Sequence, residues 1–319
     1  MARHTLILPG DGSDFAHWRH VARWLWALQV PPAEVVWLTE HSQRGSPDLF
    51  APAAHTATPV PERSSWPTAP ALTVPRRWLD LAEKALLNAA PERFALLYYL
   101  LWRMQFDAGL RHDPLDPDQV QMQHWVKAVR QEVHKMHAFV RFRPVALADD
   151  ATDGQGPLHV AWFEPSHHIV HAAAPFFVQR FANMRWAILT PQCSLRWWPQ
   201  APNVEALAHQ GIALKNAFQP FKTRPGVLSW GPGAQASDAP AADAGEALWL
   251  TYYAHIFNPA RLKVNAMRKE MPRKYWHNLP EAQLITPLIQ TAQARSAAML
   301  AEAPSTPLRK LPQSTVNKC

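Results

Sequence analysis

The sequence has few cysteines and no long hydrophobic segment. Among its 319 residues only Cys193 and Cys319 are cysteines, too few for a disulfide framework or for a four-cysteine zinc or iron–sulfur site. The longest apolar run covers residues 94–102 between Arg93 and Arg103, whereas a membrane span needs about 20 residues. The first residues do not have the layout of a signal peptide. We therefore expect a cytoplasmic protein with no membrane span, no metal site and no cofactor of its own.

Motifs of several common enzyme classes are absent as well. The chain contains no GxGxxG or GxxxxGK[ST] phosphate loop, no HExxH zinc motif and no GxSxG nucleophile elbow. The sequence GDGSD at residues 10–14 follows a predicted strand, but Asp11 and Asp14 would repel phosphate, so we interpret it as a turn and a helix N-cap. Cys193 is interpreted as a small packed residue. Residue chemistry alone therefore names no reaction.

Hydrophobic periodicity indicates a mixed fold. Apolar residues make up 48% of the chain, enough for a substantial core. Helical spacing predicts helices over residues 14–29, 78–88, 91–106, 122–137, 171–183 and 280–299. Extended patterns predict strands over residues 5–8, 35–38, 138–145, 158–163, 184–189 and 196–198. This order favours an α+β (mixed α/β) fold, in which helices back a small sheet.

Proline-rich and polar stretches suggest where the chain divides. We expect a core over residues 1–230 that carries a long, mobile, proline-rich loop at residues 40–76. A linker over residues 231–247 then leads to a helical C-terminal segment, residues 248–300, which packs on the core. Residues 301–319 are expected to be a disordered tail.

The charge balance favours a polyanionic partner. Lysine and arginine total 32 against 25 acidic residues, which gives a net charge of +7. Lys127 and Arg130 follow one stripe of the predicted helix, together with His134 and His137. Alternation after residue 138 places further cations and rings on one strand face, which neighbouring strands could extend: Phe139, Arg141, Arg143, Phe163, Arg185 and Arg196.

Such a face suits single-stranded nucleic acid, because rings stack on bases while guanidinium groups hold phosphates. The alternative is that helices cover this face and that the arginines pair with carboxylates at the strand ends. Alternation by itself does not decide which face is buried.

A second basic group lies near the C-terminus. It surrounds Glu270, Tyr275 and Trp276, and its cations are Arg261, Lys263, Arg268, Lys269, Arg273 and Lys274. This density of charge would neutralise several phosphates and make binding depend steeply on salt. The alternative interpretation is a solvated helix face, against which Tyr275, Trp276 and the helix-breaking Pro272 favour binding.

Histidines and one glutamate are the only candidates for acid–base chemistry. His134 and His137 are spaced by one helical turn, as are His168 and His171, but Arg130 and Lys135 beside the first pair disfavour a bound dication. Glu164 and His167 follow a predicted strand end, where catalytic groups often lie. The catalytic candidates are therefore His134, His137, Glu164 and His167.

Seven longer stretches of the sequence share a resemblance to one family. They are HKMHAFVRFR (134–143), WFEPSH (162–167), FVQRF (177–181), MRWAILTP (184–191), FNPARL (257–262), MPRKYW (271–276) and LPE (279–281). Together they resemble a bacterial family of unknown function that is described as DNA metabolism or DNA repair proteins. The resemblance covers most of the chain outside the linkers.

This resemblance implies a setting in DNA repair and two kinds of partner. Members of that family occur beside a radical-SAM DNA modification or repair protein, and a related domain is fused ahead of UdgX-type uracil-DNA glycosylases. The present sequence lacks the CxxxCxxC radical-SAM motif and the loop and cysteines of the glycosylase module. The resemblance therefore implies a context but no catalytic residues.

We expect a DNA-binding accessory protein of bacterial DNA repair, with DNA and either a radical-SAM repair protein or a uracil-DNA glycosylase as partners. One alternative is an enzyme that processes a nucleotide or nucleic acid with the four catalytic candidates. Another is a scaffold for the radical-SAM protein, in which a tryptophan-rich surface is the interface. Whether the chain is an enzyme stays open at this point.

Overall fold

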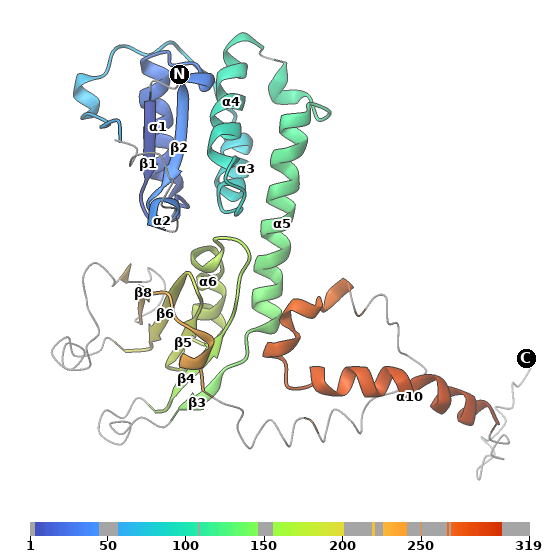
Figure 1. The fold of residues 1–319 in the computed structure, drawn as a ribbon. Coiled ribbons are helices and arrows are strands. Elements are labelled where there is room, and N and C mark those ends of the chain that lie inside the picture. The colour runs from blue at the N-terminus through green and yellow to red at the C-terminus, as the bar shows by residue number, and fades with distance from the viewer. Residues whose placement is uncertain are drawn as a thin grey trace, which may run out of the picture. The chain divides into compact units, whose positions relative to one another are not determined.

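The α+β class is confirmed by the computed structural model of the 319-residue chain (Figure 1). It describes residues 4–44, 57–107, 109–145, 156–200, 219–220, 226–240, 250, 267 and 269–301. The chain forms two units, residues 1–240 and 241–319, and this boundary falls inside the stretch where a linker is predicted. Within the described ranges, no helix is long and apolar enough to cross a membrane.

The first unit begins with a β–α–β arrangement. Strand β1 (His4–Leu8) pairs in parallel with β2 (Val35–Thr39), and helix α1 (Phe15–Ala27) connects them. The N-cap of α1 is Asp14, whose side chain accepts the His17 N–H at 3.0 Å. These elements confirm the predictions for residues 5–8, 14–29 and 35–38, because the turn and cap signals were local.

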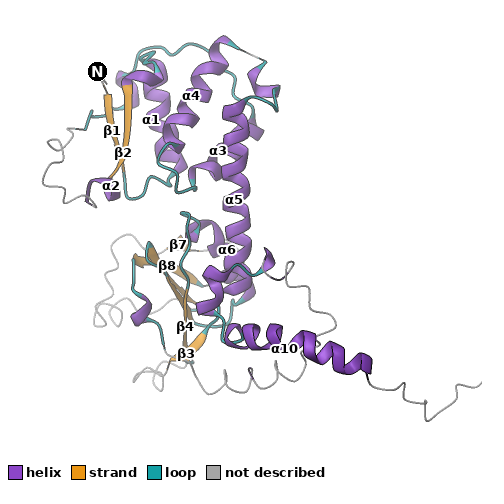
Figure 2. Ribbon diagram, turned by 45° about the vertical axis from the view of Figure 1, so that its right-hand side comes forward, coloured by secondary structure: helices purple, strands orange, loops and turns teal. Residues whose placement is uncertain are grey.

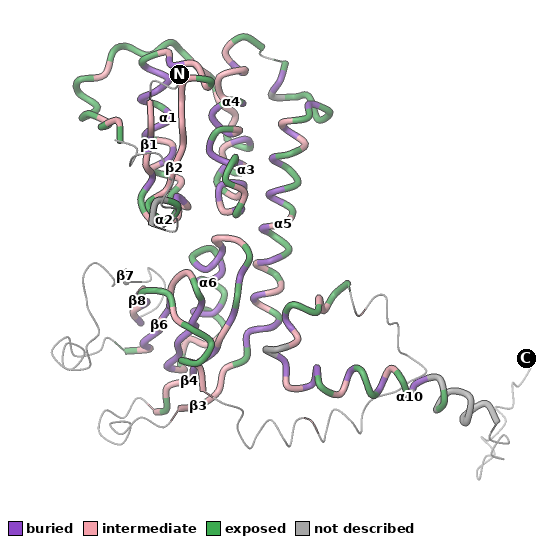
Figure 3. Tube along the Cα trace, viewed as in Figure 1, coloured by how far each residue is buried: buried purple, intermediate pink, exposed green. Residues whose placement is uncertain are grey.

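Three more helices complete this part of the core. They are α3 (Arg76–Leu86), α4 (Arg93–Phe106) and the long α5 (Pro117–Phe139). Trp37 of β2 packs against Phe94 and Tyr98 of α4, and the Tyr98 hydroxyl donates to the Val30 carbonyl at 2.7 Å. Figure 3 shows buried and exposed residues alternating along α5, as expected of a helix with one packed face.

Part of the proline-rich stretch is bound to the core. After the short helix α2 (Glu40–Arg44), residues 45–56 lie outside the described part, and residues 57–75 form an extended strap that includes the 3-10 turn η2 (Arg63–Ser65). The Thr58 N–H donates to the Thr5 carbonyl at 2.8 Å, and the Trp26 indole donates to the Pro70 carbonyl at 3.0 Å. The described strap is therefore attached to β1 and α1.

A six-stranded sheet forms the rest of the first unit (Figure 2). Its order is β3 (Arg143–Val145), β4 (Leu158–Trp162), β5 (Trp186–Leu189), β6 (Cys193–Trp198), β8 (Val227–Pro232) and β7 (Gln219–Pro220). Only β4 and β5 pair in parallel, and helix α6 (Val170–Arg180) makes the crossover between them. Phe177 of α6 packs against Trp186 of β5 on one face of the sheet.

The predicted strand over residues 138–145 is wrong in its first half. Helix α5 continues to Phe139, and the Val140 N–H still donates to the Met136 carbonyl at 3.1 Å. Phe142 then packs against Phe177 and Phe181, and pairing with β4 begins only at Arg143. A helix end followed by a short extended link can show the same alternation of apolar and polar residues in the sequence as a strand.

The second unit is helical where it is described. It contains η6 (Arg273–Asn278) and α10 (Ala282–Ala301), which contact each other. Its buried apolar side chains include Tyr275, Leu279, Ile285 and Leu288.

Gly12 should tolerate alanine poorly, whereas Gly10 in the same turn should tolerate it better. Both glycines have positive φ values, +76° at Gly12 and +57° at Gly10. An alanine Cβ at Gly12 would lie 2.5 Å from Phe94 Cζ, whereas an alanine Cβ at Gly10 would have no atom of another residue within 4 Å, its two chain neighbours aside. We expect Gly12→Ala to lower the free energy of unfolding by about 2–4 kcal/mol and Gly10→Ala by about 1 kcal/mol, measured by urea denaturation. Equal losses would contradict the role of the Phe94 contact.

Candidate nucleic-acid interface

A basic groove lies between α3 and α5. These helices run side by side (Figure 1), and the groove between them has a volume of about 480 Å³. It is lined by Arg77, Leu81, Gln123, His124, Val126, Lys127, Arg130 and Gln131. Lys127 and Arg130, both predicted to bind nucleic acid, are here joined by Arg77, which the sequence analysis did not identify. We call this feature the α3–α5 groove.

The positive charge of the α3–α5 groove is not neutralised locally. Arg77, Lys127 and Arg130 are exposed, and no acidic residue is among the lining side chains. Within the described part of the chain, none of the three cations lies within 4 Å of a carboxylate. The lining contains no Phe, Tyr or Trp, and its cations favour contacts with phosphates over base stacking.

The predicted basic and aromatic sheet face does not form as one open surface. Phe139 and Phe163 are buried, and Arg185 is only 4% exposed with its guanidinium 4.7 Å from the Trp198 ring centre. Arg143 donates to the Pro240 carbonyl at 2.8 Å, while Arg141 is exposed and donates to the Ala138 carbonyl at 2.7 Å. Phe139 and Arg185 therefore serve the core, which corrects their assignment to a binding face.

Arg196 of β6, the other arginine proposed for that face, is partly buried. Burial lowers the pKa of Arg196, and the positive charge of Arg185 lowers it further. The guanidinium groups of Arg185 and Arg196 thus lie near each other in the region of the six-stranded sheet.

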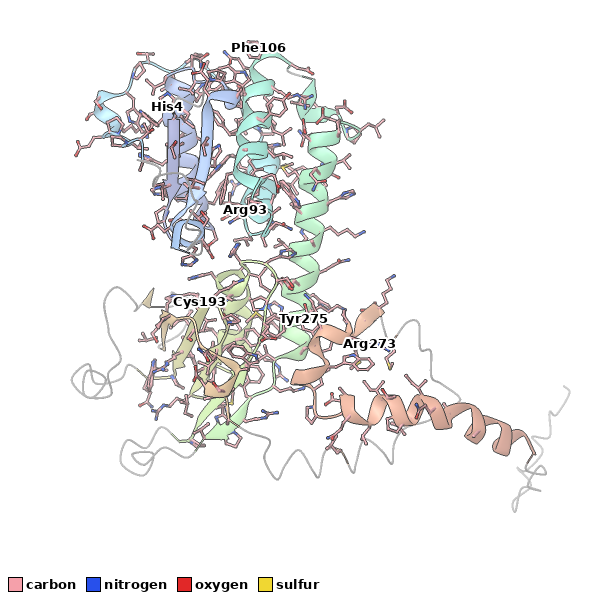
Figure 4. All side chains as sticks on the ribbon, viewed as in Figure 1. His4, Arg93, Phe106, Cys193, Arg273 and Tyr275 are labelled. Carbon is pink, nitrogen blue, oxygen red and sulfur yellow. The ribbon has the colours of Figure 1, made fainter. Side chains whose placement is uncertain are left out.

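The basic segment of the second unit is only partly open. Lys269, Arg273 and Lys274 are exposed, whereas Arg261, Lys263 and Arg268 lie outside the described residues. The Arg273 guanidinium is 5.6 Å from the centre of the Trp276 ring, and Lys274 Nζ is 4.6 Å from the centre of the Tyr275 ring. Arg273 and Tyr275 are labelled in Figure 4. Tyr275 is buried, and the Trp276 indole donates to the Met271 carbonyl at 2.9 Å. Tyr275 is therefore unavailable for stacking on a base.

Among the four acid–base candidates, His137 has a packing partner and His167 a hydrogen-bond partner. The His137 ring stacks on Phe176 at 4.1 Å, and burial lowers its pKa; the Ala173 backbone opposes this shift and His134 adds to it. His167 Nδ1 accepts the Ala89 N–H at 3.2 Å. His134 and Glu164 are exposed, on α5 and just after β4 respectively. The two partnered histidines thus join structural elements of the first unit.

A group of polar residues from distant parts of the sequence meets in the first unit. Asp11 Oδ2 lies 2.8 Å from His168 Nδ1, and Arg93, which is 3% exposed, donates to the Asp11 carbonyl at 2.6 Å. His171 stacks on Trp230 with ring centres 3.5 Å apart. Figure 4 labels Arg93 at the start of α4 and Cys193 at the start of β6. We call Asp11, Arg93, His168, His171 and Cys193 the junction cluster.

Burial and the Asp11–His168 pair set the protonation states of the junction cluster. Burial by itself would raise the pKa of Asp11, but the hydrogen bond and charge of His168, with help from Ser13, hold it well below its usual range. Burial lowers the pKa of Arg93 to about 10, an effect that Asp11 opposes. Burial, followed by the Asp11 charge, raises the pKa of Cys193 to about 11. His171 also has a pKa lowered by burial and opposed by Asp11.

These protonation states favour a structural role of the Asp11–His168 pair over nucleophilic chemistry. A carboxylate beside an imidazole can orient a catalytic base, but the Cys193 thiol, whose pKa is raised to about 11, is neutral near pH 7 and hence a poor nucleophile. Among the described residues, no group of three or more His, Cys, Asp or Glu side chains is placed to hold a metal ion. The junction cluster therefore holds the Gly10–Ser13 turn against the loop after β4.

Comparison with known proteins identifies the family. A family model described as a domain of unknown function, DUF4130, matches residues 91–281. The chain belongs to the DUF4130 family. The match begins just before α4 and includes α5 with Lys127 and Arg130, whereas Arg77 and the whole β–α–β part precede it. No curated protein and no solved structure matches the chain.

Sequence reasoning identified only part of the site in this DUF4130 protein. Lys127 and Arg130 were visible because they share one helix and one stripe. Arg77 and the Asp11–His168 pair depend on contacts between segments far apart in the chain, for which a single sequence gives no signal.

Asp11→Asn should destabilise the protein in a pH-dependent way. Because the folded-state pKa of Asp11 is depressed, its stabilisation is present above the unfolded value of about 3.9 and is lost as the pH falls toward the folded value. In urea denaturation, Asp11→Asn should lower the free energy of unfolding by about 1–3 kcal/mol relative to the parent near pH 6. This difference between variant and parent should become smaller below about pH 4.

Asp14→Asn is the matched control for this measurement, since asparagine also caps helices well and Asp14 caps α1. It should change the unfolding free energy little across the same pH range. A gap between Asp11→Asn and the parent that is as large at pH 3 as at pH 6 would rule out the charged pair.

Cys193 should react slowly with alkylating reagents. Since its pKa is raised to about 11, its thiolate fraction at pH 7.5 is about two orders of magnitude below that of a free cysteine. The rate with iodoacetamide, followed by mass spectrometry in a Cys319→Ser background, should keep rising above pH 9. Unfolding in urea should restore the normal rate, and a plateau near pH 8.5 in the folded protein would disprove the assignment.

Proposed function

We propose that this chain binds DNA through the α3–α5 groove and acts as an accessory protein in bacterial DNA repair or DNA metabolism. The observation that carries the proposal is the convergence of Arg77, Lys127 and Arg130 on one groove without neutralising carboxylates among the described residues. Such a groove follows a phosphate backbone and releases its counterions. The net charge of +7 supports the same partner.

The proposed role in repair comes from the family resemblance of the sequence motifs. It includes a catalytic partner, either a radical-SAM repair protein or a uracil-DNA glycosylase, to which this chain would present DNA. An accessory role agrees with the neutral Cys193 thiol, the stacking of His137 on Phe176 and the hydrogen bond of His167. We therefore prefer DNA binding to a hydrolytic or transfer reaction by the four acid–base candidates.

Removing two groove charges should weaken DNA binding and flatten its salt dependence. The Lys127→Ala/Arg130→Ala double variant should bind labelled single-stranded and duplex DNA about 10-fold or more weakly near 100 mM salt. In fluorescence anisotropy its slope of log K against log salt should be smaller by about 1–2. Repeating the series with uracil in the DNA tests the proposed link to uracil repair.

Arg180→Ala is the control, because Arg180 is an exposed helical arginine on α6 that is not part of the groove. It should leave affinity and slope nearly unchanged. Unchanged binding by the double variant would remove the groove assignment, and an absence of binding to any DNA at low salt would remove the proposed function.

A further inference from the structure

A second hollow opens between α1 and the strap of residues 57–75. Its volume is about 500 Å³, within the usual range of small-molecule sites. Three arginines line it: Arg19 and Arg23, one turn apart on α1, and Arg63 of η2. The other walls are apolar and aromatic and include Trp18, Trp26, Trp66, Leu72, Leu79 and Tyr98. We call this feature the α1–strap pocket.

The positive charges of the α1–strap pocket lack local compensation. No acidic residue lines it, and in the described ranges none of the three arginines lies within 4 Å of a carboxylate. Partial burial lowers the pKa of Arg23, and the charges of Arg19 and Arg63 lower it further. An anion bound between the three guanidinium groups would relieve this repulsion.

The aromatic walls are held in fixed positions. The Trp26 indole donates to the Pro70 carbonyl and the Trp66 indole to the Pro61 carbonyl, each at 3.0 Å. Trp66 is half-buried, and the ring of His20 lies 4.9 Å from it. Both indole N–H groups are already bonded to the backbone, and Trp26 is only 7% exposed. The ring that offers a ligand an apolar surface for a planar group is therefore Trp66.

The combination of features selects one class of ligand. A small inorganic anion would use the arginines but leave the apolar walls unused, and a monocarboxylate would match only part of the charge. A phosphate with a planar aromatic base uses both, because guanidinium groups bind phosphate in a fork and indoles stack on bases. We propose that the α1–strap pocket binds a nucleoside monophosphate unit, with the phosphate at Arg19, Arg23 and Arg63 and the base against Trp66.

Such a unit has two possible sources, a free nucleotide or a nucleotide turned out of a DNA strand. The second source rests on the proposed DNA binding and is supported by position: Leu79 lines the pocket, while Arg77 and Leu81 of the same helix line the α3–α5 groove. The two hollows therefore flank the first turns of α3. Most residues of the pocket precede the region matched by the DUF4130 model.

The first arm of the test measures free nucleotides. Deoxyadenosine monophosphate and deoxyuridine monophosphate are titrated by calorimetry and by tryptophan fluorescence, with deoxyadenosine and inorganic phosphate as half-ligands. We expect saturable binding of at least one nucleotide, at least 10-fold weaker binding of each half-ligand, and at least a 10-fold loss of affinity in Arg19→Ala/Arg23→Ala. Lys127→Ala/Arg130→Ala and Arg180→Ala should bind free nucleotide as the parent does.

The second arm measures a nucleotide within DNA. A single strand that carries 2-aminopurine should show increased fluorescence on binding if that base leaves the stack, and Arg19→Ala/Arg23→Ala should lose the increase while still binding DNA through the groove. Circular dichroism confirms folding of each variant, and Arg23→Gln, a change at an exposed residue, serves if the double variant unfolds.

The two arms separate failure of the pocket from failure of the groove. Binding in either arm that depends on Arg19 and Arg23 supports the pocket and identifies the source of its nucleotide. Absence of both signals from the folded parent, or signals unchanged in the pocket variants, overturns the pocket proposal. Loss of DNA affinity only in the groove variant would then leave the proposed function standing.

Discussion

A buried carboxylate joins the long helix to the loop that follows β4. Glu132 lies within α5, is 4% exposed, and accepts the backbone N–H groups of Ser166 and His167 at 2.9 and 2.7 Å. A charge in this position costs several kcal/mol unless hydrogen bonds satisfy it. The loop is therefore held on α5, and it in turn places His168 against Asp11. Because α5 also packs on α3 and α4, the groove wall and the sheet are positioned by the same helix.

The distribution of acidic residues explains where positive charge accumulates. Asp116 and Asp118 bind Arg103 at 2.6 Å each, Asp11 is paired with His168, and Glu132 is bonded to backbone N–H groups. These carboxylates serve caps and junctions inside the fold. In the described parts, the cations that line the groove and the pocket have no carboxylate within 4 Å, so both concave sites carry net positive charge.

The sequence predicted elements whose signals are local and missed those that depend on tertiary context. The turn at Gly10, the cap at Asp14 and the periodicity of α1, α4 and α6 gave correct elements. The alternation after residue 138 did not, because the core recruits Phe139 as helix and Phe142 as a ring beside Phe177. The site followed the same rule: Lys127 and Arg130 share a helix, whereas Arg77 and Arg63 reach their hollows only through folding.

The geometry around α3 also constrains what kind of DNA could use both hollows. Residues two positions apart point in widely different directions on a helix, so Leu79 in the pocket and Arg77 in the groove open on different sides of α3. The backbone of a duplex can follow the groove without change, but a nucleotide can reach the pocket only after leaving its stack. That step costs a few kcal/mol in paired DNA and least in single-stranded or mismatched DNA. Selectivity for unpaired bases would then arise from the cost of unstacking, without any contact that reads a base edge.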